Sequence, residues 1–330
     1  MFNRKNVSNS KWLDWIMPIV VIAVVLLLVS SANSLISKND MPEEVQQLAE
    51  NDDTLWLSGM WVTLTNCKVS DNECAAGIDT YISDEARVKA SVAVQNGLDV
   101  IQPYYLMVFA DGVPVEFEIA GDNYYSYPIE LSSEKINMDL WFSPEFSLNI
   151  GRLDFLLFFD GDEKSDYHLN SYTVLLTQNG EQQVPNVIQI TTPQRDILKG
   201  SHNGGTYSAW LWNENSQCSE SDFMGPRDIV LHKDETVLLE AIASKPGLYR
   251  TVLINNGKPI CFTLEGSNRT WLDWESLGTN MLQTNMILDA ASINDGSFFT
   301  VSTPICMEDI TTSCLASPKI KVTYAPTSEE

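Results

Sequence analysis

The chain repeats one pattern of residues, and an internal repeat restricts the possible folds more than any other sequence feature. A Trp stands six residues before a Cys at 61–67 and again at 212–218. Further on, residues 104–117 and 249–262 share a Tyr, an apolar run, Asp/Asn-Gly-x-Pro and a final Phe. The offset is 151 at the first match and 145 at the second. Two collinear matches favour a tandem duplication over chance.

Each copy of the longer motif has the sequence of a β-hairpin. The dipeptides Asp-Gly at 111–112 and Asn-Gly at 256–257 suit a two-residue turn with positive φ. The flanking segments 105–109 and 250–254 are rich in β-branched and aromatic residues, which favour strands. We therefore expect two equivalent hairpins.

Other short apolar segments are separated by Gly, Asn, Asp and Pro, with the spacing typical of β-sandwiches. A helical turn fits within 131–140. The predicted fold class is all-β, with two tandem immunoglobulin-like β-sandwich domains after one N-terminal transmembrane helix. The further expected strands are 56–64, 87–94, 153–159, 172–177, 184–191, 236–243, 286–290, 297–303 and 319–324.

Each copy spans roughly 120 residues, a size that can bury its own core. The Gly- and Pro-rich stretch between the copies predicts a linker. The expected division is 1–11 short cytoplasmic N-terminus, 12–32 transmembrane signal-anchor, 33–54 acidic stem with one short helix, 55–192 first β-sandwich, 193–205 linker, 206–326 second β-sandwich and 327–330 tail.

An apolar run at 16–29 follows the basic residues Arg4, Lys5 and Lys11. With its flanks, 12–32, it would span about 31 Å as a helix, which is enough to cross the hydrocarbon core. Basic residues next to such a segment favour the cytoplasmic side. The sequence therefore predicts a single-pass protein of the plasma or inner membrane, whose N-terminus is cytoplasmic and whose C-terminal domains are extracytoplasmic. The lipid bilayer is then one partner.

A cleaved signal peptide is the alternative, because small residues at 30–32 suit a signal peptidase. Both interpretations place the remaining chain outside the cytoplasm. The chain carries 44 acidic and 20 basic residues, a net charge of −24. Such an acidic surface repels phosphate, so we expect no nucleic-acid partner. Solubility is the simplest reason for the acidity.

All cysteines follow the apolar run, which an oxidising compartment allows. Local pairings 67–74 and 306–314 would leave 218–261 as the third disulfide, although six cysteines allow fifteen pairings. A zinc site is disfavoured because no CxxC occurs. The expected disulfide-forming residues are Cys67, Cys74, Cys218, Cys261, Cys306 and Cys314.

One acidic loop is a candidate metal site. Asp160, Asp162, Glu163 and Asp166 could bind Ca²⁺ through carboxylate oxygens. Ser171 stands where an EF-hand requires glutamate, so that motif is excluded. The pattern favours a solvated hairpin loop, with the Ca²⁺ site as the alternative. No other cofactor is expected.

Three tyrosines, Tyr124, Tyr125 and Tyr127, form a candidate binding cluster. In a strand, Tyr124 and Tyr125 point to opposite faces, so both cannot enter one core. An exposed aromatic can stack on sugars or anchor a protein partner. The simpler interpretation is core packing, which also applies to the tryptophans of the second copy, Trp210, Trp212, Trp271 and Trp274.

Catalytic signatures are missing from the sequence. The histidines, His168, His202 and His232, lie in no catalytic motif, and no GxSxG or Walker A pattern occurs. We predict a membrane-anchored, extracytoplasmic, non-catalytic interaction or structural module with a protein or glycan partner outside the cytoplasm. The alternatives are a carbohydrate-binding module that uses exposed aromatics and a tethered hydrolase whose paired acids meet only in the fold.

Overall fold

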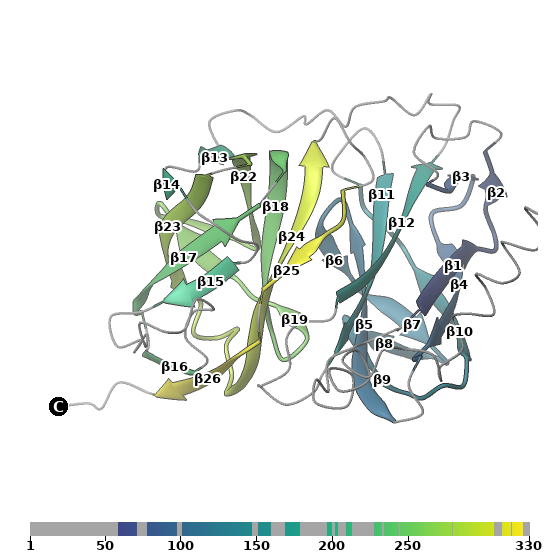
Figure 1. The fold of residues 1–330 in the computed structure, drawn as a ribbon, viewed down its shortest axis with the longest axis horizontal. Helices are drawn as coiled ribbons and strands as arrows, with labels where there is room; N and C mark the ends of the chain where they lie inside the picture. The colour runs from purple at the N-terminus through teal and green to yellow at the C-terminus, as the bar shows by residue number, and fades with distance from the viewer. Residues whose placement is uncertain are drawn as a thin grey trace, which may run out of the picture. The chain divides into compact units, whose positions relative to one another are not determined.

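The computed structural model contains only β-strands as regular secondary structure in the residues that it describes (Figure 1). No helix in those ranges is long and apolar enough to cross a membrane. The expected anchor 12–32, the stem 33–54 and the expected strand 184–191 lie outside them. The described residues are 59–70, 78–97, 101–146, 151–159, 169–178, 197–199, 202–203, 209–212, 228–232, 234–243, 245–278, 280–306, 312–317 and 319–325.

The first half of the described chain forms two sheets. One has the order β1-β4-β10-β7-β8, and the other has the order β2-β3-β12-β11-β5-β6, with β9 also paired to β5. The strands are β1 Gly59–Leu64, β2 Lys68–Val69, β3 Thr80–Ser83, β4 Val88–Gln95, β5 Gln102–Ala110, β6 Val113–Val115, β7 Phe117–Ile119, β8 Asp122–Tyr124, β9 Ser126–Leu131, β10 Ile136–Phe142, β11 Gly151–Phe159 and β12 Leu169–Gln178.

The second half also forms two sheets, with orders β15-β17-β23-β20-β21 and β13-β22-β18-β24-β26-β16. Figure 1 shows β18 beside β24 in the latter sheet. The strands are β13 Ile197–Lys199, β14 His202–Asn203, β15 Ala209–Trp212, β16 Asp228–His232, β17 Thr236–Ile242, β18 Pro246–Asn255, β19 Lys258–Pro259, β20 Phe262–Leu264, β21 Ser267–Arg269, β22 Trp271–Leu277, β23 Asn280–Leu288, β24 Gly296–Cys306, β25 Leu315–Ala316 and β26 Ile320–Ala325.

The two halves follow the same strand order. The sheet β1-β4-β10-β7-β8 corresponds to β15-β17-β23-β20-β21, and the path β3-β12-β11-β5 corresponds to β16-β26-β24-β18. One parallel pair of each half also matches, because β3 runs parallel to β12 and β16 runs parallel to β26. The motifs that are shared in sequence thus lie on equivalent strands.

Both predicted hairpins are confirmed: β5 pairs with β6, and β18 pairs with β19. At their turns Asp111 and Asn256 have φ of 47° and 48°. Their side chains explain why Asp or Asn is used there. The Asp111 Oδ1 accepts a hydrogen bond from the backbone N–H of Arg152 at 3.0 Å, and the Asn256 Oδ1 accepts one from Ser297 at 3.0 Å. Each turn is therefore tied to the neighbouring strand.

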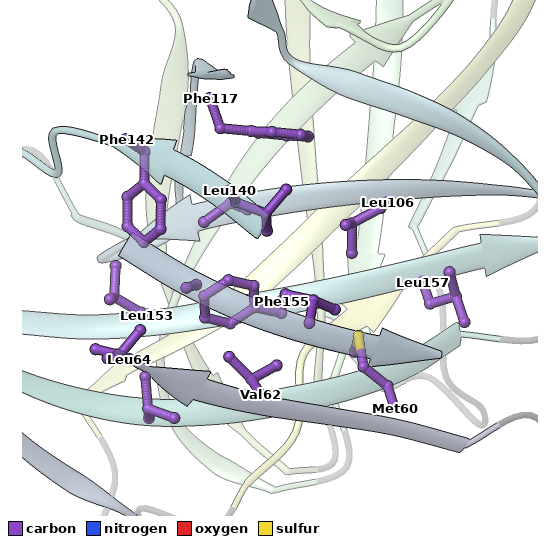
Figure 2. Close-up of a cluster of buried hydrophobic side chains, with 14 of the residues drawn as sticks. Met60, Val62, Leu64, Leu106, Phe117, Leu140, Phe142, Leu153, Phe155 and Leu157 are labelled. Atoms are coloured by element: carbon purple, nitrogen blue, oxygen red, sulfur yellow. The ribbon is translucent and has the colours of Figure 1, made fainter. Parts of the chain in front are cut away.

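Each half has its own core between its two sheets. In β4 the side chains alternate between buried and partly exposed positions, as expected for a strand with one covered face. Figure 2 shows the first core, where Phe142 and Phe155 meet edge to face with centroids 6.0 Å apart. In the second core Tyr249 stacks on Trp274 at 5.3 Å. These sandwich-like cores hold the hairpins in place.

A third apolar cluster joins the halves, and we call it the joint. The strand β11 is buried at eight consecutive positions, because one face covers the first core and the other faces the second half. Two-sided burial explains its nearly continuous apolar sequence. The joint consists of Met107, Phe109, Leu156 and Phe158 from the first half and Val252, Ile254, Phe299, Val301 and Cys314 from the second.

Two buried ion pairs flank this joint, and each reaches across it. Arg152 contacts Asp154 at 2.8 Å and donates to the Thr312 carbonyl of the second half at 2.9 Å. Arg250 contacts Asp273 at 2.8 Å and donates to the Asp111 carbonyl of the first half at 3.1 Å. Because both guanidinium groups are neutralised and hydrogen-bonded, their burial is tolerated.

Two segments differ from expectation. The helical turn expected within 131–140 is wrong, because β9 ends at Leu131 and β10 begins at Ile136. Alternate apolar residues in β10 favour a strand. In addition, β13 and β14 lie within the stretch that was expected to be the linker, and they pair with β22 and β23 of the second half.

Candidate functional site

A groove of about 440 Å³ opens on the first half, where the β7–β8 hairpin meets the ends of β6 and β10. We call it the acidic groove. Strand β10 contributes an aromatic ring, the hairpin contributes polar groups, and the chain that follows β8 contributes a second aromatic ring. The residues that matter for its chemistry are Arg87, Glu116, Glu118, Tyr125, Trp141 and Glu145.

The three candidate tyrosines lie at and after the end of the β7–β8 hairpin, and they take two different environments. Tyr124 packs on Phe117, with ring centroids 6.4 Å apart, and meets Tyr127 edge to face at 4.9 Å. Both tyrosines lie against the first core. Tyr125 follows the last residue of β8 and lines the groove. Tyr124 ends β8 and Tyr125 lies just beyond it, so these neighbouring tyrosines take different environments.

Trp141 lies on the outer face of β10, between Lys89 of β4 and Glu118 of β7. The Lys89 Nζ lies 5.6 Å from the centroid of its ring, and the Arg87 Cζ lies 5.2 Å away. Arg87 also pairs with Glu118. The ring is therefore held by cation–π contacts while it lines the groove.

The groove has an excess of negative charge. Three carboxylates, those of Glu116, Glu118 and Glu145, line it together with one guanidinium, that of Arg87. Glu116 and Glu145 are exposed. Carboxylates and aromatic rings together attract cations, and carboxylate oxygens also accept hydrogen bonds from sugar hydroxyls. The groove is thus suited to a basic side chain or to a sugar.

The other candidate residues are placed as follows. Asp160, Asp162, Glu163 and Asp166 lie outside the described residues, so the Ca²⁺ site stays a prediction. The described residues contain no cluster of three or more metal-binding side chains. Trp274 is buried in the second core, and Trp271 is half-buried. The side chains of Trp210 and Trp212 lie outside the description.

No disulfide forms among the described cysteines, Cys67, Cys261 and Cys314. Burial raises the pKa of the Cys67 thiol, and burial also raises that of Cys314, which lies in the joint beside Asp154. The three expected disulfides each need a partner whose side chain is not described. Those partners are Cys74, Cys218 and Cys306. The pairings stay predictions.

Sequence reasoning missed Trp141 and the acidic residues around it. Apolar residues at 136, 138, 140 and 142 alternate with Asn137, Asp139 and Trp141. This period of two predicts a strand with Trp141 on its outer face. An aromatic residue on the polar face of an alternating strand was therefore the signal that could have located the groove.

No family model matches the chain, and no curated protein matches it. A solved FixG-related protein from Vibrio parahaemolyticus is 18% identical and covers 37% of this chain and 95% of its own, with a TM-score of 0.23. A protein of unknown function from Porphyromonas gingivalis W83 is 11% identical and covers 80% of this chain and 98% of its own, with a TM-score of 0.21. The YadV chaperone is 11% identical and covers 75% of this chain and 97% of its own, with a TM-score of 0.22. These scores support no assignment of function.

Proposed function

We propose that this protein is a single-pass, membrane-anchored module that binds a partner outside the cytoplasm without catalysis. In this proposal, two tandem immunoglobulin-like β-sandwiches follow a transmembrane helix at 12–32, and the N-terminus is cytoplasmic. The apolar run and the basic residues before it support the membrane orientation. The repeated strand order supports the two sandwiches.

The acidic groove is the observation that carries the binding function. Its three carboxylates and two aromatic rings match a basic segment of a protein partner, because Lys or Arg side chains bind both carboxylates and ring faces. The joint supports a structural role as well, since a buried apolar cluster and two hydrogen-bonded arginines connect the two halves.

Crosslinking and capture from native membranes test this binding function. The full-length wild type should capture a protein that the double variant Glu116→Lys/Glu145→Lys does not capture, because the charge of the groove is reversed. Glu130→Lys is the matched control, since Glu130 is exposed but does not line the groove. Equal capture by the groove variant and the control would refute the groove as the partner site.

The membrane orientation has its own test. A reporter that is active only outside the cytoplasm should be active when it is fused after Glu330. Removal of 12–32 should abolish that activity, because the chain would lose the segment that directs it into the membrane. Activity of a strictly cytosolic reporter at the same position would exclude the proposed orientation.

A glycan is the second candidate partner, and the position of Tyr125 favours it. Tyr125 and Trp141 line one groove together with polar side chains, which is the usual composition of a sugar-binding surface. On a glycan array, Tyr125→Ala should lose any binding that the wild type shows. Trp61→Ala is the control, because Trp61 is half-exposed outside the groove. Loss of binding in the control alone, or no binding by the wild type, would exclude this candidate.

A further inference from the structure

The second half has a cavity of about 550 Å³, and the hairpin equivalent to that of the acidic groove forms its wall. Cys261, Asn268 and Thr270 line it, at positions 145 residues after Glu116, Asn123 and Tyr125. We call it the arginine cavity. The same backbone therefore presents a recess in each half, and the side chains of the two recesses differ.

Arg269 gives this cavity its charge. It is the last residue of β21, and its Nε is buried without a hydrogen-bond partner among the described residues. A buried donor without a partner is costly, because it has lost water and gained nothing in return. Asp273 also lines the cavity, but it is already paired with Arg250 through both carboxylate oxygens. Because Arg269 lines the cavity, its guanidinium group is placed to bind an acceptor on a ligand that enters there.

The remaining wall indicates what kind of acceptor fits. Trp271 is half-buried, and the Arg250 Cζ lies 5.0 Å from its ring centroid. The ring also lines the cavity, where an apolar sugar face can stack on it. Asn268 accepts a hydrogen bond from the Thr263 hydroxyl at 2.8 Å, so its amide N–H groups remain as donors for ligand oxygens.

We infer that the arginine cavity binds a carboxylated sugar. The guanidinium of Arg269 binds the carboxylate, and Trp271 stacks against the pyranose ring. The Asn268 amide donates a hydrogen bond to a hydroxyl oxygen or to the ring oxygen of the sugar. Arginine binds a carboxylate through paired N–H groups, which gives geometric selectivity in addition to charge. This site is separate from the acidic groove and does not depend on the function proposed for that groove.

Calorimetric titration of the full-length protein in detergent micelles tests the inference. The probes are glucuronate, glucose and glucose 6-phosphate. Glucuronate should bind at least about tenfold more tightly than glucose, because only glucuronate supplies the charged acceptor. Tighter binding of glucose 6-phosphate than of glucuronate would overturn the carboxylate assignment, and so would equal binding of glucuronate and glucose.

Variants identify the residue responsible. Arg269→Gln should weaken glucuronate binding about tenfold or more and should leave the weak glucose binding unchanged. Lys258→Gln removes one exposed positive charge of the same half outside the cavity, so it should bind like the wild type. A melting curve of each variant verifies its fold. If Arg269→Gln is folded and binds glucuronate like the wild type, the inference is wrong.

A further variant separates this site from the acidic groove. Glu116→Lys should keep glucuronate affinity unchanged, because Glu116 lies in the other half. Trp271→Ala should weaken both glucuronate and glucose, since stacking does not depend on the carboxylate. Loss of glucuronate binding in Glu116→Lys, with binding retained in Arg269→Gln, would place the sugar in the acidic groove and overturn the inference.

Discussion

The two halves share a backbone but differ in the recess that each presents. In the first half, Glu116 and Tyr125 line the acidic groove; in the second, Cys261 and Thr270 occupy the equivalent positions. The Arg269 that gives the second recess its positive charge corresponds to Tyr124, which packs on the first core. The difference shows that the turns and cores fix the fold of the repeat while the walls of its recesses are free to change.

The joint differs from the recesses because its ion pairs are not repeated. The position equivalent to Arg152 is Ser297, and the position equivalent to Arg250 is Tyr105. Each half therefore supplies a guanidinium group from a different strand, β11 in one half and β18 in the other. The two halves therefore make different polar contacts across the joint.

The largest expected effect comes from breaking an ion pair of the joint. Arg152→Met should destabilise the fold by about 3–5 kcal/mol, because the carboxylate of Asp154 remains buried without its partner. Denaturant unfolding measures the loss. Lys68→Gln breaks an ion pair whose side chains are 78% and 71% exposed, so it should cost at most about 1 kcal/mol. Similar losses in both variants would contradict the role of the joint.

Substitution of two neighbouring tyrosines in the first half should affect stability differently, because one packs on the core and the other lines the groove. Tyr124→Ala should cost about 2 kcal/mol, because the ring packs on Phe117 and Tyr127. Tyr125→Ala should change stability little, since its ring lines the groove. Thermal unfolding of the two variants measures the difference. An equal loss for both would show that Tyr125 also belongs to the core.

Each half contains a tyrosine whose raised pKa should make the stability of the fold depend on alkaline pH. Burial raises the pKa of Tyr249 and of Tyr172 to about 12, and Tyr172 also donates a hydrogen bond to Asp79 at 2.9 Å. The folded protein keeps these protons at pH values where an unfolded tyrosine, with a pKa near 10, loses them. Their stabilisation is therefore complete below about pH 10 and is lost as the pH rises to about 12.

Unfolding measurements across this pH range, together with tyrosinate absorbance, test the alkaline prediction. Tyr249→Phe and Tyr172→Phe should each make the free energy of unfolding fall less steeply with pH. The phenyl ring keeps most of the packing but has no proton to lose. A variant whose stability falls as steeply as that of the wild type would show that its tyrosine has an ordinary pKa.

The smallest expected effect concerns the turns. Ala120 has φ of 53°, so Ala120→Gly should stabilise the fold by up to about 1 kcal/mol, because glycine adopts that conformation without strain. Asp111→Gly should instead destabilise it, although φ is similar, because the hydrogen bond to the Arg152 N–H is lost. The denaturant midpoint of unfolding of each variant, relative to that of the wild type, measures the change in stability. Stabilisation by both substitutions would show that the Asp111 side chain contributes nothing.

The sequence predicted the parts of the fold that local chemistry determines. The Asp-Gly and Asn-Gly turns marked the two confirmed hairpins, whereas the second pair of turns was missed because Ala120 and Glu265 rarely adopt positive φ. The joint was missed for a different reason. Whether the second face of β11 meets water or another sheet depends on distant residues such as Thr312, and only its continuous apolar sequence indicates two-sided burial.

The candidate site was only partly predictable as well. The sequence indicated that Tyr124 and Tyr125 cannot both enter one core if they share a strand, but Tyr125 lies beyond the end of β8, which the local pattern did not show. The residues that surround Tyr125 come from strands far away in the chain, so local patterns cannot bring Arg87 and Trp141 together. Likewise, the unpartnered Nε of Arg269 depends on which acids lie within reach in the fold.

Hydrogen exchange of the full-length protein in increasing denaturant tests the shared joint most directly. We expect amides of β4 in the first half and of β17 in the second to lose protection at the same denaturant concentration, since the joint couples the two cores. If β17 opens while β4 stays protected, or the reverse, the halves unfold separately and the joint does not unite them.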